Sequence, residues 1–311
     1  MLKLFSGTAN IKLSLQVAKI LDIPLSQSEV VRFEDSEVRV RILEQVKDQT
    51  CIVIQPTSNP TDPRIMELIF FCDALKRAEA KKVIAIIPYF GYARQNIQHR
   101  EGEAVSAHVV IKLLESAGFD EIAAFDLHDE ATQGVFSVPF KNLSAMPTLA
   151  KEIKDYLKKQ KIPFGKVAVV SPDQGGVEKA RLFGEHLFNK KDFRLVVAEK
   201  KRDLDHIHQS SALDLYGDVK GKVVILVDDI VTSGGTLLNA AHLCLDEGAK
   251  RILAAVVHHD FSSQAPSKLR QSEIEKLFTT NTTPLKDYHR FPKMKEISVA
   301  PVIAAALEPY L

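Results

Sequence analysis

The chain has 311 residues, of which 45 % are hydrophobic and 26 % are charged, and its formal net charge is +1. This composition is that of an ordinary globular protein, and at the level of net charge no basic field for nucleic acid is visible. No apolar run approaches the length of a membrane span, and the chain is long enough for two domains of usual size.

Strands and helices are predicted to alternate along most of the chain, starting with a short strand within residues 1–8. Short aliphatic runs predict further strands at Cys51–Gln55, Val83–Pro88, Ile122–Asp126, Val167–Ser171, Leu195–Ala198, Val223–Val227 and Ile252–Val257. Longer stretches predict helices at Asn10–Leu21, Arg64–Ala78, Ser106–Ala117, Pro147–Lys159, Gly176–Leu187 and Gly235–Glu247. The alternation favours the α/β class, with mainly parallel central sheets flanked by helices.

The two halves of the chain share one pattern. Gly118 and Gly248 each end a predicted helix, a predicted strand follows each glycine, and a histidine comes ten positions later, at His128 and His258. A helix that ends at glycine is common, so the matched spacing to histidine is the stronger observation. We interpret the pattern as two tandem copies of one domain.

The boundary between the two copies is expected near Ala145–Pro147, where proline and small residues interrupt the pattern. Residues 1–146 are predicted to form the N-terminal domain and residues 147–311 the C-terminal domain. The last twenty or so residues are expected to pack back on the N-terminal domain.

The most informative motif follows the buried strand predicted at Val223–Val227. Two carboxylates, Asp228 and Asp229, stand where that strand is predicted to end, and the turn Thr232–Thr236 leads into the next helix. A strand, loop and helix in this order present backbone N–H groups and a helix N-terminus to a phosphate. The carboxylates repel phosphate and suit hydroxyl groups or a metal. The motif therefore predicts a sugar phosphate as ligand.

Two further loops of the first half carry polar groups after a predicted strand. Arg94 follows the strand that ends at Pro88, and its guanidinium suits a phosphate or a purine, although a structural salt bridge is an equal alternative. His128 follows Asp126 and could help to hold Mg²⁺, although taken alone it is better read as a structural histidine.

Two loops of the second half have similar positions. Asp173 lies in the loop Ser171–Gly176, whose glycines suit close approach of the backbone to a ligand. Lys200 and Arg202 lie at the start of a polar stretch, where they could close over a charged transition state. The alternative for this cluster, taken alone, is a solvated run of charges.

The three cysteines, Cys51, Cys72 and Cys244, are far apart and lie in apolar or helical runs. They are predicted to be buried free thiols, which suits a reducing cytoplasm.

Taken together, these segments resemble the ribose-phosphate pyrophosphokinase family, also called phosphoribosyl pyrophosphate synthetases. The likeness covers nearly the whole chain, through Leu4–Gly7, Arg32–Glu37, Tyr92–Gln95, Asp126–His128, Ser171–Gly176, Lys200–Arg202, Asp228–Thr236, Thr280–Asn281 and Ile297–Pro301. It implies two domains of the phosphoribosyltransferase type. The chain departs from the family pattern at Thr232, where an acidic residue is usual, and at Gln174, where a small apolar residue is usual.

The resemblance implies transfer of the pyrophosphoryl group of ATP to the C1 hydroxyl of ribose 5-phosphate, for nucleotide biosynthesis, with Mg²⁺ as cofactor. The implied ATP-binding residues are Phe33, Asp35 and Glu37, donated by a neighbouring subunit, together with Arg94 and Gln95. The implied ribose 5-phosphate-binding residues are Asp228, Asp229, Thr232, Ser233, Gly234, Gly235 and Thr236. By the same likeness His128 and Asp173 are metal-linked, and Lys200 and Arg202 are the catalytic cations.

The resemblance also implies a cytoplasmic homo-oligomer, a dimer at least and potentially a hexamer, with no nucleic-acid or membrane partner. Two other functions stay open. A salvage phosphoribosyltransferase shares the acidic loop, but such enzymes usually have one such domain. A non-catalytic regulatory subunit of a synthetase is the other alternative, and loss of His128 or of the cluster Lys200–Arg202 would favour it; both are present.

Overall fold

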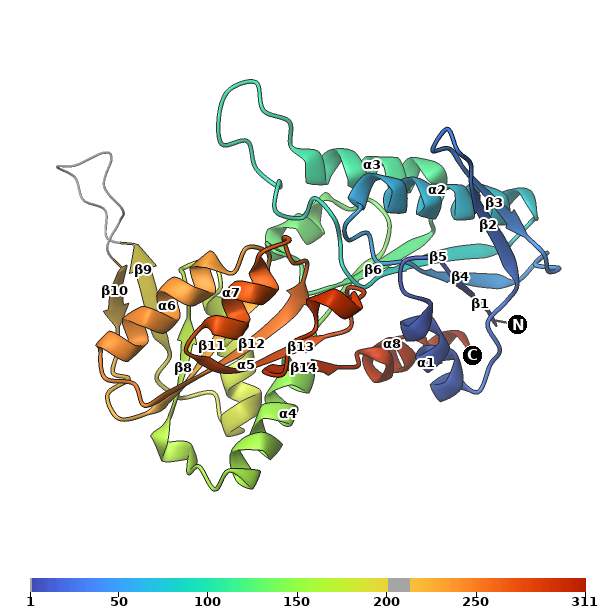
Figure 1. Cartoon of the computed structure of the whole chain (residues 1–311). Helices are drawn as coiled ribbons and strands as arrows, with labels where there is room; N and C mark the ends of the chain where they lie inside the picture. The colour runs from blue at the N-terminus through green and yellow to red at the C-terminus, as the bar shows by residue number, and fades with distance from the viewer. Residues whose placement is uncertain (1, 201–212) are drawn as a thin grey trace. The chain divides into compact units, whose positions relative to one another are not determined.

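The structure, a computed structural model, describes residues 2–200 and 213–311 of the chain. The chain forms two compact units, each with a parallel sheet and helices against it (Figure 1). Unit 1 comprises Met1–Ser144, Thr282–Pro284 and Ser298–Leu311, and unit 2 comprises Ala145–Asn281 and Leu285–Ile297. The predicted α/β class with mainly parallel sheets is confirmed.

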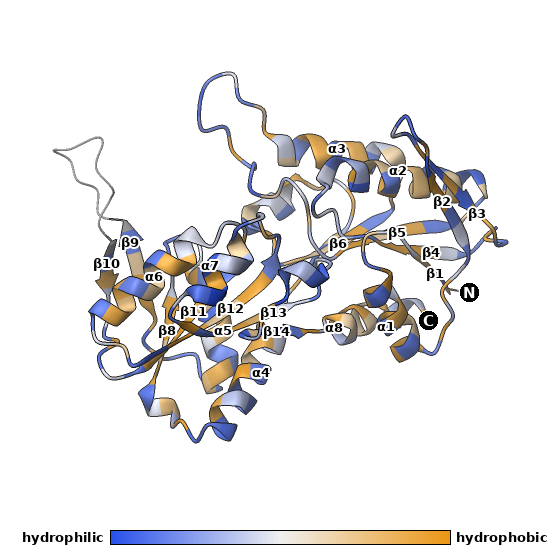
Figure 2. Cartoon of the chain, viewed as in Figure 1, coloured by the Kyte–Doolittle hydropathy of each residue, from blue (hydrophilic) through white to orange (hydrophobic). Residues whose placement is uncertain are grey.

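The sheet of unit 1 has the strand order β1-β4-β5-β6-β7, and all neighbouring strands are parallel. Its strands are β1 (Leu2–Ser6), β4 (Thr50–Ile54), β5 (Lys82–Ile87), β6 (Glu121–Phe125) and β7 (Phe140–Leu143). The central strands are almost wholly apolar (Figure 2) because helices cover both faces of a parallel sheet.

Four helices belong to unit 1: α1 (Ile11–Leu21), α2 (Thr61–Arg77), α3 (Ser106–Ala117) and α8 (Ala300–Leu307). Helices α2 and α3 lie on one side of the sheet, and α1 lies on the other side with α8 packed against it (Figure 1). Helix α2 begins three residues before the predicted Arg64, because Pro63 lies in the first turn, where a backbone N–H is not needed.

Unit 1 also contains a two-stranded antiparallel hairpin that the sequence analysis did not predict. Strands β2 (Ser28–Arg32) and β3 (Val38–Ile42) pair along their whole length, and β3 lies against α2. The valines of the hairpin are partly buried, and Val30 and Val40 lie against the core of the unit.

The sheet of unit 2 has the order β10-β9-β8-β11-β12-β13-β14, and only β10 runs antiparallel to its neighbour among the described strands. Its strands are β8 (Val167–Ser171), β9 (Val196–Lys200), β10 (Leu213–Tyr216), β11 (Val223–Val231), β12 (Arg251–His259), β13 (Ile274–Thr280) and β14 (Met294–Ile297). Its helices are α4 (Met146–Lys159), α5 (Val177–Phe188), α6 (Gly235–Asp246) and α7 (Ala265–Gln271). Helices α4 and α5 pack together on one side of this sheet, and α6 and α7 lie on the other (Figure 1).

The repeated pattern of the two halves occupies equivalent places in the two sheets. Helix α3 ends at Gly118 (φ 103°) and leads into β6, and α6 is followed by Gly248 (φ 85°) and β12. Both glycines take the left-handed conformation that ends many helices. Among the described helices, none has the length and apolar character needed to cross a membrane.

Candidate active site

The acidic pair of unit 2 lies inside strand β11 rather than after it. The strand continues past the predicted end at Val227 to Val231, because β12 pairs with it through this whole segment. Strand β8, on the other side, pairs with β11 only as far as Leu226. Asp228 and Asp229 therefore extend beyond the end of β8, at the carboxyl edge of the sheet.

The two carboxylates are crowded together in a buried place. Asp229 is only 4 % exposed, and its backbone N–H donates to Asp228 Oδ1 at 2.8 Å. Burial first, and then the neighbouring charges of Asp229 and Asp173, raise the pKa of Asp228 well above its usual range. Burial and like charges thus disfavour the ionised form of this carboxyl group. A cation or the hydroxyl groups of a ligand would stabilise the ionised form.

A buried lysine that the sequence analysis missed pairs with this acidic group. Lys179 Nζ lies 3.2 Å from Asp229 Oδ2, and the two side chains are 8 % and 6 % exposed. Lys179 belongs to α5, on the same buried face as Ala180, Phe183 and Leu187. A lysine among the apolar positions of an amphipathic helix is the signal that could have revealed it.

The turn after β11 presents a helix N-terminus to solvent. Gly234 takes φ 80° and caps α6, and the N–H of Gly235 points to Ser233 Oγ at 3.4 Å. The carbonyl of Thr232 accepts from the N–H of Ser262 at 3.1 Å, which fixes the turn to the segment after β12. Ser233, Gly235 and Thr236 are exposed. The first N–H groups of a helix have no intrahelical acceptor, so this turn can bind an anion.

The loop after β8 holds Asp173 beside the same edge. Asp173 Oδ1 accepts from the N–H of Gly176 at 3.0 Å, and its carbonyl accepts from Ser171 Oγ at 2.7 Å. A Cβ atom at Gly176 would lie 2.8 Å from Ser171 Oγ, so the loop requires glycine there. Gln174, one of the departures from the family pattern, donates a hydrogen bond to Glu199 of β9.

Strand β9 ends at Lys200, the first residue of the predicted catalytic cluster. It pairs in parallel with β8, with Ser171 opposite Val197, and Lys200 is its last residue. The side chain of Lys200 and the whole of Arg202 lie outside the described residues. The backbone alone therefore places Lys200 at the carboxyl edge that also carries Asp173.

In unit 1, Arg94 and Gln95 lie in the loop after β5 and line a cavity of about 370 Å³. Both are exposed, and Gln95 Oε1 accepts from Ser106 Oγ at 2.8 Å. Arg94 makes no ion pair with any of the described residues. The structural salt bridge, one of the two alternatives that the sequence left open, is thus not formed among the described residues.

His128 lies in the exposed turn after β6. This turn and the Arg94 loop are tied together, because Asn96 Nδ2 donates to Asp129 Oδ2 at 2.6 Å. The structure thus brings Arg94 and His128 to one edge of the sheet of unit 1, whereas Asp173, the other predicted metal-linked residue, belongs to unit 2.

Phe33, Asp35 and Glu37 lie together in the turn of the β2–β3 hairpin. Phe33 is 43 % exposed, and Asp35 Oδ1 accepts from the N–H of Glu37 at 3.1 Å. Figure 1 shows this hairpin and the Arg94 loop at opposite ends of α3.

Comparison with known proteins gives the same family over nearly the whole chain. Residues 2–118 match the model of the N-terminal domain of ribose phosphate pyrophosphokinase, and residues 147–309 match the phosphoribosyl synthetase-associated domain. The ribose-phosphate pyrophosphokinase of Campylobacter jejuni is 38 % identical over 305 residues, which cover 98 % of this chain and 94 % of that protein. Chloroplastic ribose-phosphate pyrophosphokinase 2 of Arabidopsis thaliana is 38 % identical over 307 residues, 98 % of this chain and 74 % of that protein.

The crystal structure of phosphoribosylpyrophosphate synthetase from Mycobacterium smegmatis superposes on this fold with a TM-score of 0.87 and 34 % identity. The match covers 98 % of this chain and 97 % of that one. The chain therefore belongs to the ribose-phosphate pyrophosphokinase family.

Proposed function

We propose that this chain transfers the pyrophosphoryl group of ATP to the C1 hydroxyl of ribose 5-phosphate, giving phosphoribosyl pyrophosphate and AMP. The observation that carries the proposal lies at the carboxyl edge of the sheet of unit 2. There the buried acidic pair of β11 is followed by a turn and by the N-terminus of α6. Acceptors for hydroxyl groups next to a site for a phosphate are what a sugar phosphate requires.

Ribose 5-phosphate would bind with its hydroxyl groups donating to Asp228 and Asp229. Its 5-phosphate would accept from backbone N–H groups and hydroxyls of the turn Thr232–Thr236, whose outer residues are exposed. The ion pair with Lys179 would hold the Asp229 carboxylate in one orientation, in which it can accept from the sugar.

ATP would bind at Arg94 and Gln95, whose side chains line the cavity after β5. Phe33, Asp35 and Glu37 would complete the adenine site from a neighbouring subunit, because an aromatic face and a carboxylate acceptor suit an adenine ring and its amino group. This assignment requires a homo-oligomer, a dimer at least.

The donor groups of Asp173 and His128, in the loops after β8 and β6, are compatible with Mg²⁺. Among the described residues, no three His, Cys, Asp or Glu side chains gather as a metal site. Mg²⁺ usually takes one or two carboxylates and completes its shell with water and substrate phosphates, so a full protein cage is not expected. His128 in unit 1 and Asp173 in unit 2 are each assigned as a metal-linked residue of its own unit, and Mg²⁺ would neutralise charge on the phosphates of ATP.

In the reaction, the C1 oxygen forms a bond to the β-phosphorus of ATP, and the bond from that phosphorus to the oxygen bridging to the α-phosphorus breaks, so that AMP leaves. Lys200 and Arg202 would stabilise the negative charge that gathers on these oxygens. Lys200 is the last residue of β9, and a cation at the end of a strand suits a group that acts on the transition state more than on binding.

The test is to incubate the protein with ATP, Mg²⁺ and ribose 5-phosphate and to measure AMP. AMP should form only when the sugar is present, and its absence in all conditions would contradict the proposed reaction.

Lys200→Ala should lower kcat by on the order of 10²–10³ with little change in KM. Asp229→Ala should instead raise KM for ribose 5-phosphate. Near-normal turnover of Lys200→Ala would mean that the cluster is a solvated run of charges.

We propose the cytoplasm as the compartment, because buried free thiols are compatible with its reducing conditions. All three are buried, and burial raises the pKa of Cys51 to about 11 and the pKa of Cys72 and of Cys244 to about 12. Such thiols stay protonated and unreactive at neutral pH.

A further inference from the structure

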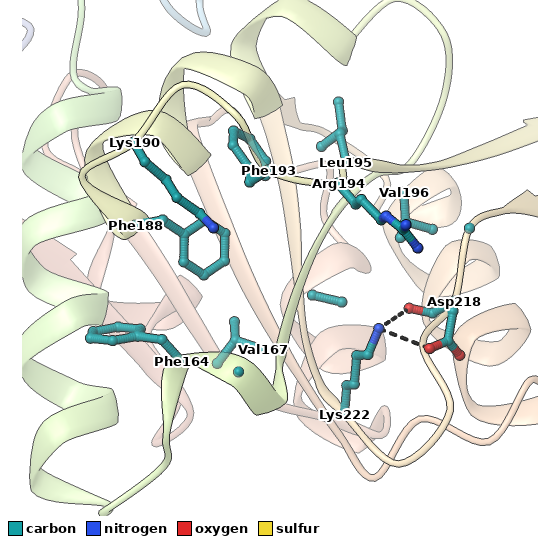
Figure 3. A pocket seen from close by; sticks show the side chains of 13 residues that line it. Phe164, Val167, Phe188, Lys190, Phe193, Arg194, Leu195, Val196, Asp218 and Lys222 are labelled. Carbon is teal, nitrogen blue, oxygen red and sulfur yellow. Dashed lines mark hydrogen bonds and ion pairs between the residues drawn. The ribbon is translucent and has the colours of Figure 1, made fainter.

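Unit 2 has a cavity of about 650 Å³ at the edge of its sheet opposite the acidic pair (Figure 3). It is formed where β8 and β9 begin, beside the end of α5 and the segment that precedes β11. The turn Thr232–Thr236 follows the other end of β11. The cavity therefore belongs to neither of the sites described above.

Three aromatic rings form one wall of the cavity. The ring of Phe188 lies 6.3 Å from that of Phe164 and 5.3 Å from that of Phe193, between ring centroids, and all three side chains are half-buried. Phe193 packs directly on the backbone of α5 at Gly184, where any side chain would collide with the ring. The rings are thus fixed by packing, yet they keep part of their faces toward the cavity.

Three cations and one carboxylate also line the cavity. Lys222 is held by Asp218, with 2.9 Å from Nζ to a carboxylate oxygen. Lys190 and Arg194 are exposed, and their side chains make no ion pair or hydrogen bond with any residue that the structure describes. Three positive charges and one negative charge leave a formal charge of +2 on the lining.

We propose that this cavity binds a small organic anion that combines an aromatic ring with a phosphate or carboxylate group. The ring would lie against Phe188 and its aromatic neighbours, and the anion would accept from Lys190 and Arg194. An apolar ligand would leave both cations unused, and a bare inorganic anion would leave the rings in water. The volume is in the range of small-molecule sites, about 300–1,000 Å³, which are mostly apolar with a few charged groups.

The test uses the intact protein and 1-naphthyl phosphate as probe, with binding followed by titration calorimetry. We expect saturable binding that persists with saturating ribose 5-phosphate, because the cavity is separate from the proposed sugar-phosphate site. ATP does not serve as a competitor in this test, because it also combines an aromatic ring with phosphate groups. 1-Naphthoate, measured in parallel, distinguishes a phosphate from a carboxylate preference. Inorganic phosphate and 1-naphthol should each bind much more weakly than the probe. Binding of inorganic phosphate as tight as that of the probe would overturn the aromatic part of the proposal.

Matched variants locate the site. The double variant Lys190→Gln, Arg194→Gln should weaken probe binding by about tenfold or more, as expected for lost hydrogen bonds to a charged group. Phe188→Leu should weaken the naphthyl probes and leave inorganic phosphate unaffected. Lys191→Gln, an exposed neighbour that does not line the cavity, is the control and should bind as the parent does. Thermal melting checks that each variant is folded.

The proposal is overturned if the folded double variant binds the probe as the parent does, if ribose 5-phosphate displaces the probe, or if no saturable binding occurs. It is also overturned if the double variant changes only the self-association of the protein, because the face would then be an interface between copies of the chain. None of these outcomes depends on whether the protein forms AMP, so the proposed reaction is tested separately.

Discussion

At the scale of single residues, Lys179 is the group whose removal tests the acidic pair most directly. Its ammonium compensates a carboxylate that is almost wholly buried. Lys179→Met keeps most of the side-chain volume but leaves Asp229 without this cation. We expect KM for ribose 5-phosphate to rise about 10- to 100-fold, and the free energy of unfolding to fall by about 3–5 kcal/mol.

Lys179→Arg should restore most of the affinity, because it keeps the charge, while Glu178→Gln on the exposed side of the same helix is the control. Initial-rate kinetics and urea unfolding measure the two quantities. A Lys179→Met variant with unchanged KM would show that the pair serves folding alone.

Asp228 could be predicted from the sequence as a site residue, whereas Lys179 could not. The acidic pair could be predicted, because a buried strand, two carboxylates and a turn follow one another along the chain. The partner of Asp229 is fifty positions earlier, on a helix whose apolar pattern it interrupts. Only the parallel packing of β8 beside β11, with α5 across them, brings the two together.

At the scale of elements, local pattern predicted the buried strands and the longer helices but missed the hairpin β2–β3. Strand β3 alternates aliphatic residues with arginine, which indicates a strand with one face in water, whereas β2 does not alternate. Strands β13 and β14 were not predicted either, since the last strand predicted from the sequence is Ile252–Val257. Strand β13 pairs with β12 and β14 pairs with β13, and no local pattern encodes these pairings between distant segments.

The C-terminal segment is held to unit 1 by a cluster around Glu121, the first residue of β6. Its carboxylate accepts from Tyr310 Oη at 2.6 Å and lies 2.8 Å from the ammonium groups of Lys82 and Lys141. Burial would raise the pKa of Glu121, but the hydrogen bonds from Lys141, Lys82 and Tyr310 outweigh it and lower the pKa to about 2.

Glu121→Gln should therefore lower the free energy of unfolding at pH 7 by about 1–3 kcal/mol. Because the pKa in the folded state is below the ordinary value of 4.5, the contribution of Glu121 is present above about pH 4.5 and is lost as the pH falls toward 2. Urea unfolding of parent and variant at several pH values measures the difference, with the exposed Glu308→Gln as control. A difference that stays constant down to pH 2 would contradict the assignment.

At the scale of the whole molecule, the proposed adenine site predicts that activity needs more than one copy of the chain. Phe33→Ala and Arg94→Ala should each be nearly inactive, because each removes one part of every shared site. In a two-fold dimer of the two variants, one of the two sites has both parts intact. After random exchange of subunits, about one quarter of the parent activity should return.

Rates of AMP formation before and after mixing measure this recovery, and sedimentation at the same concentration gives the oligomeric state. Mixtures that remain inactive despite exchange, or a fully active monomer, would place Phe33 and Arg94 in one subunit's own site.

The α/β class and the repeated pattern could be predicted because each depends on short stretches of sequence. The division into units depends on distant contacts. Helix α8 follows the whole of unit 2 in the chain, yet it packs against α1, nearly three hundred positions earlier. Its apolar sequence shows that α8 must be buried against another element, but it does not show which element that is.

This return of the chain to unit 1 has a consequence for synthesis on the ribosome. Ala145–Ile297 are translated between the main body of unit 1 and the segment Ser298–Leu311 that completes it. At about 5–20 residues per second, this interval lasts roughly 8–30 s. During that time the surface of α1 that α8 later covers is without its partner, and the nascent polypeptide must keep it from associating with other chains. The unit that is translated first is therefore the one that is finished last.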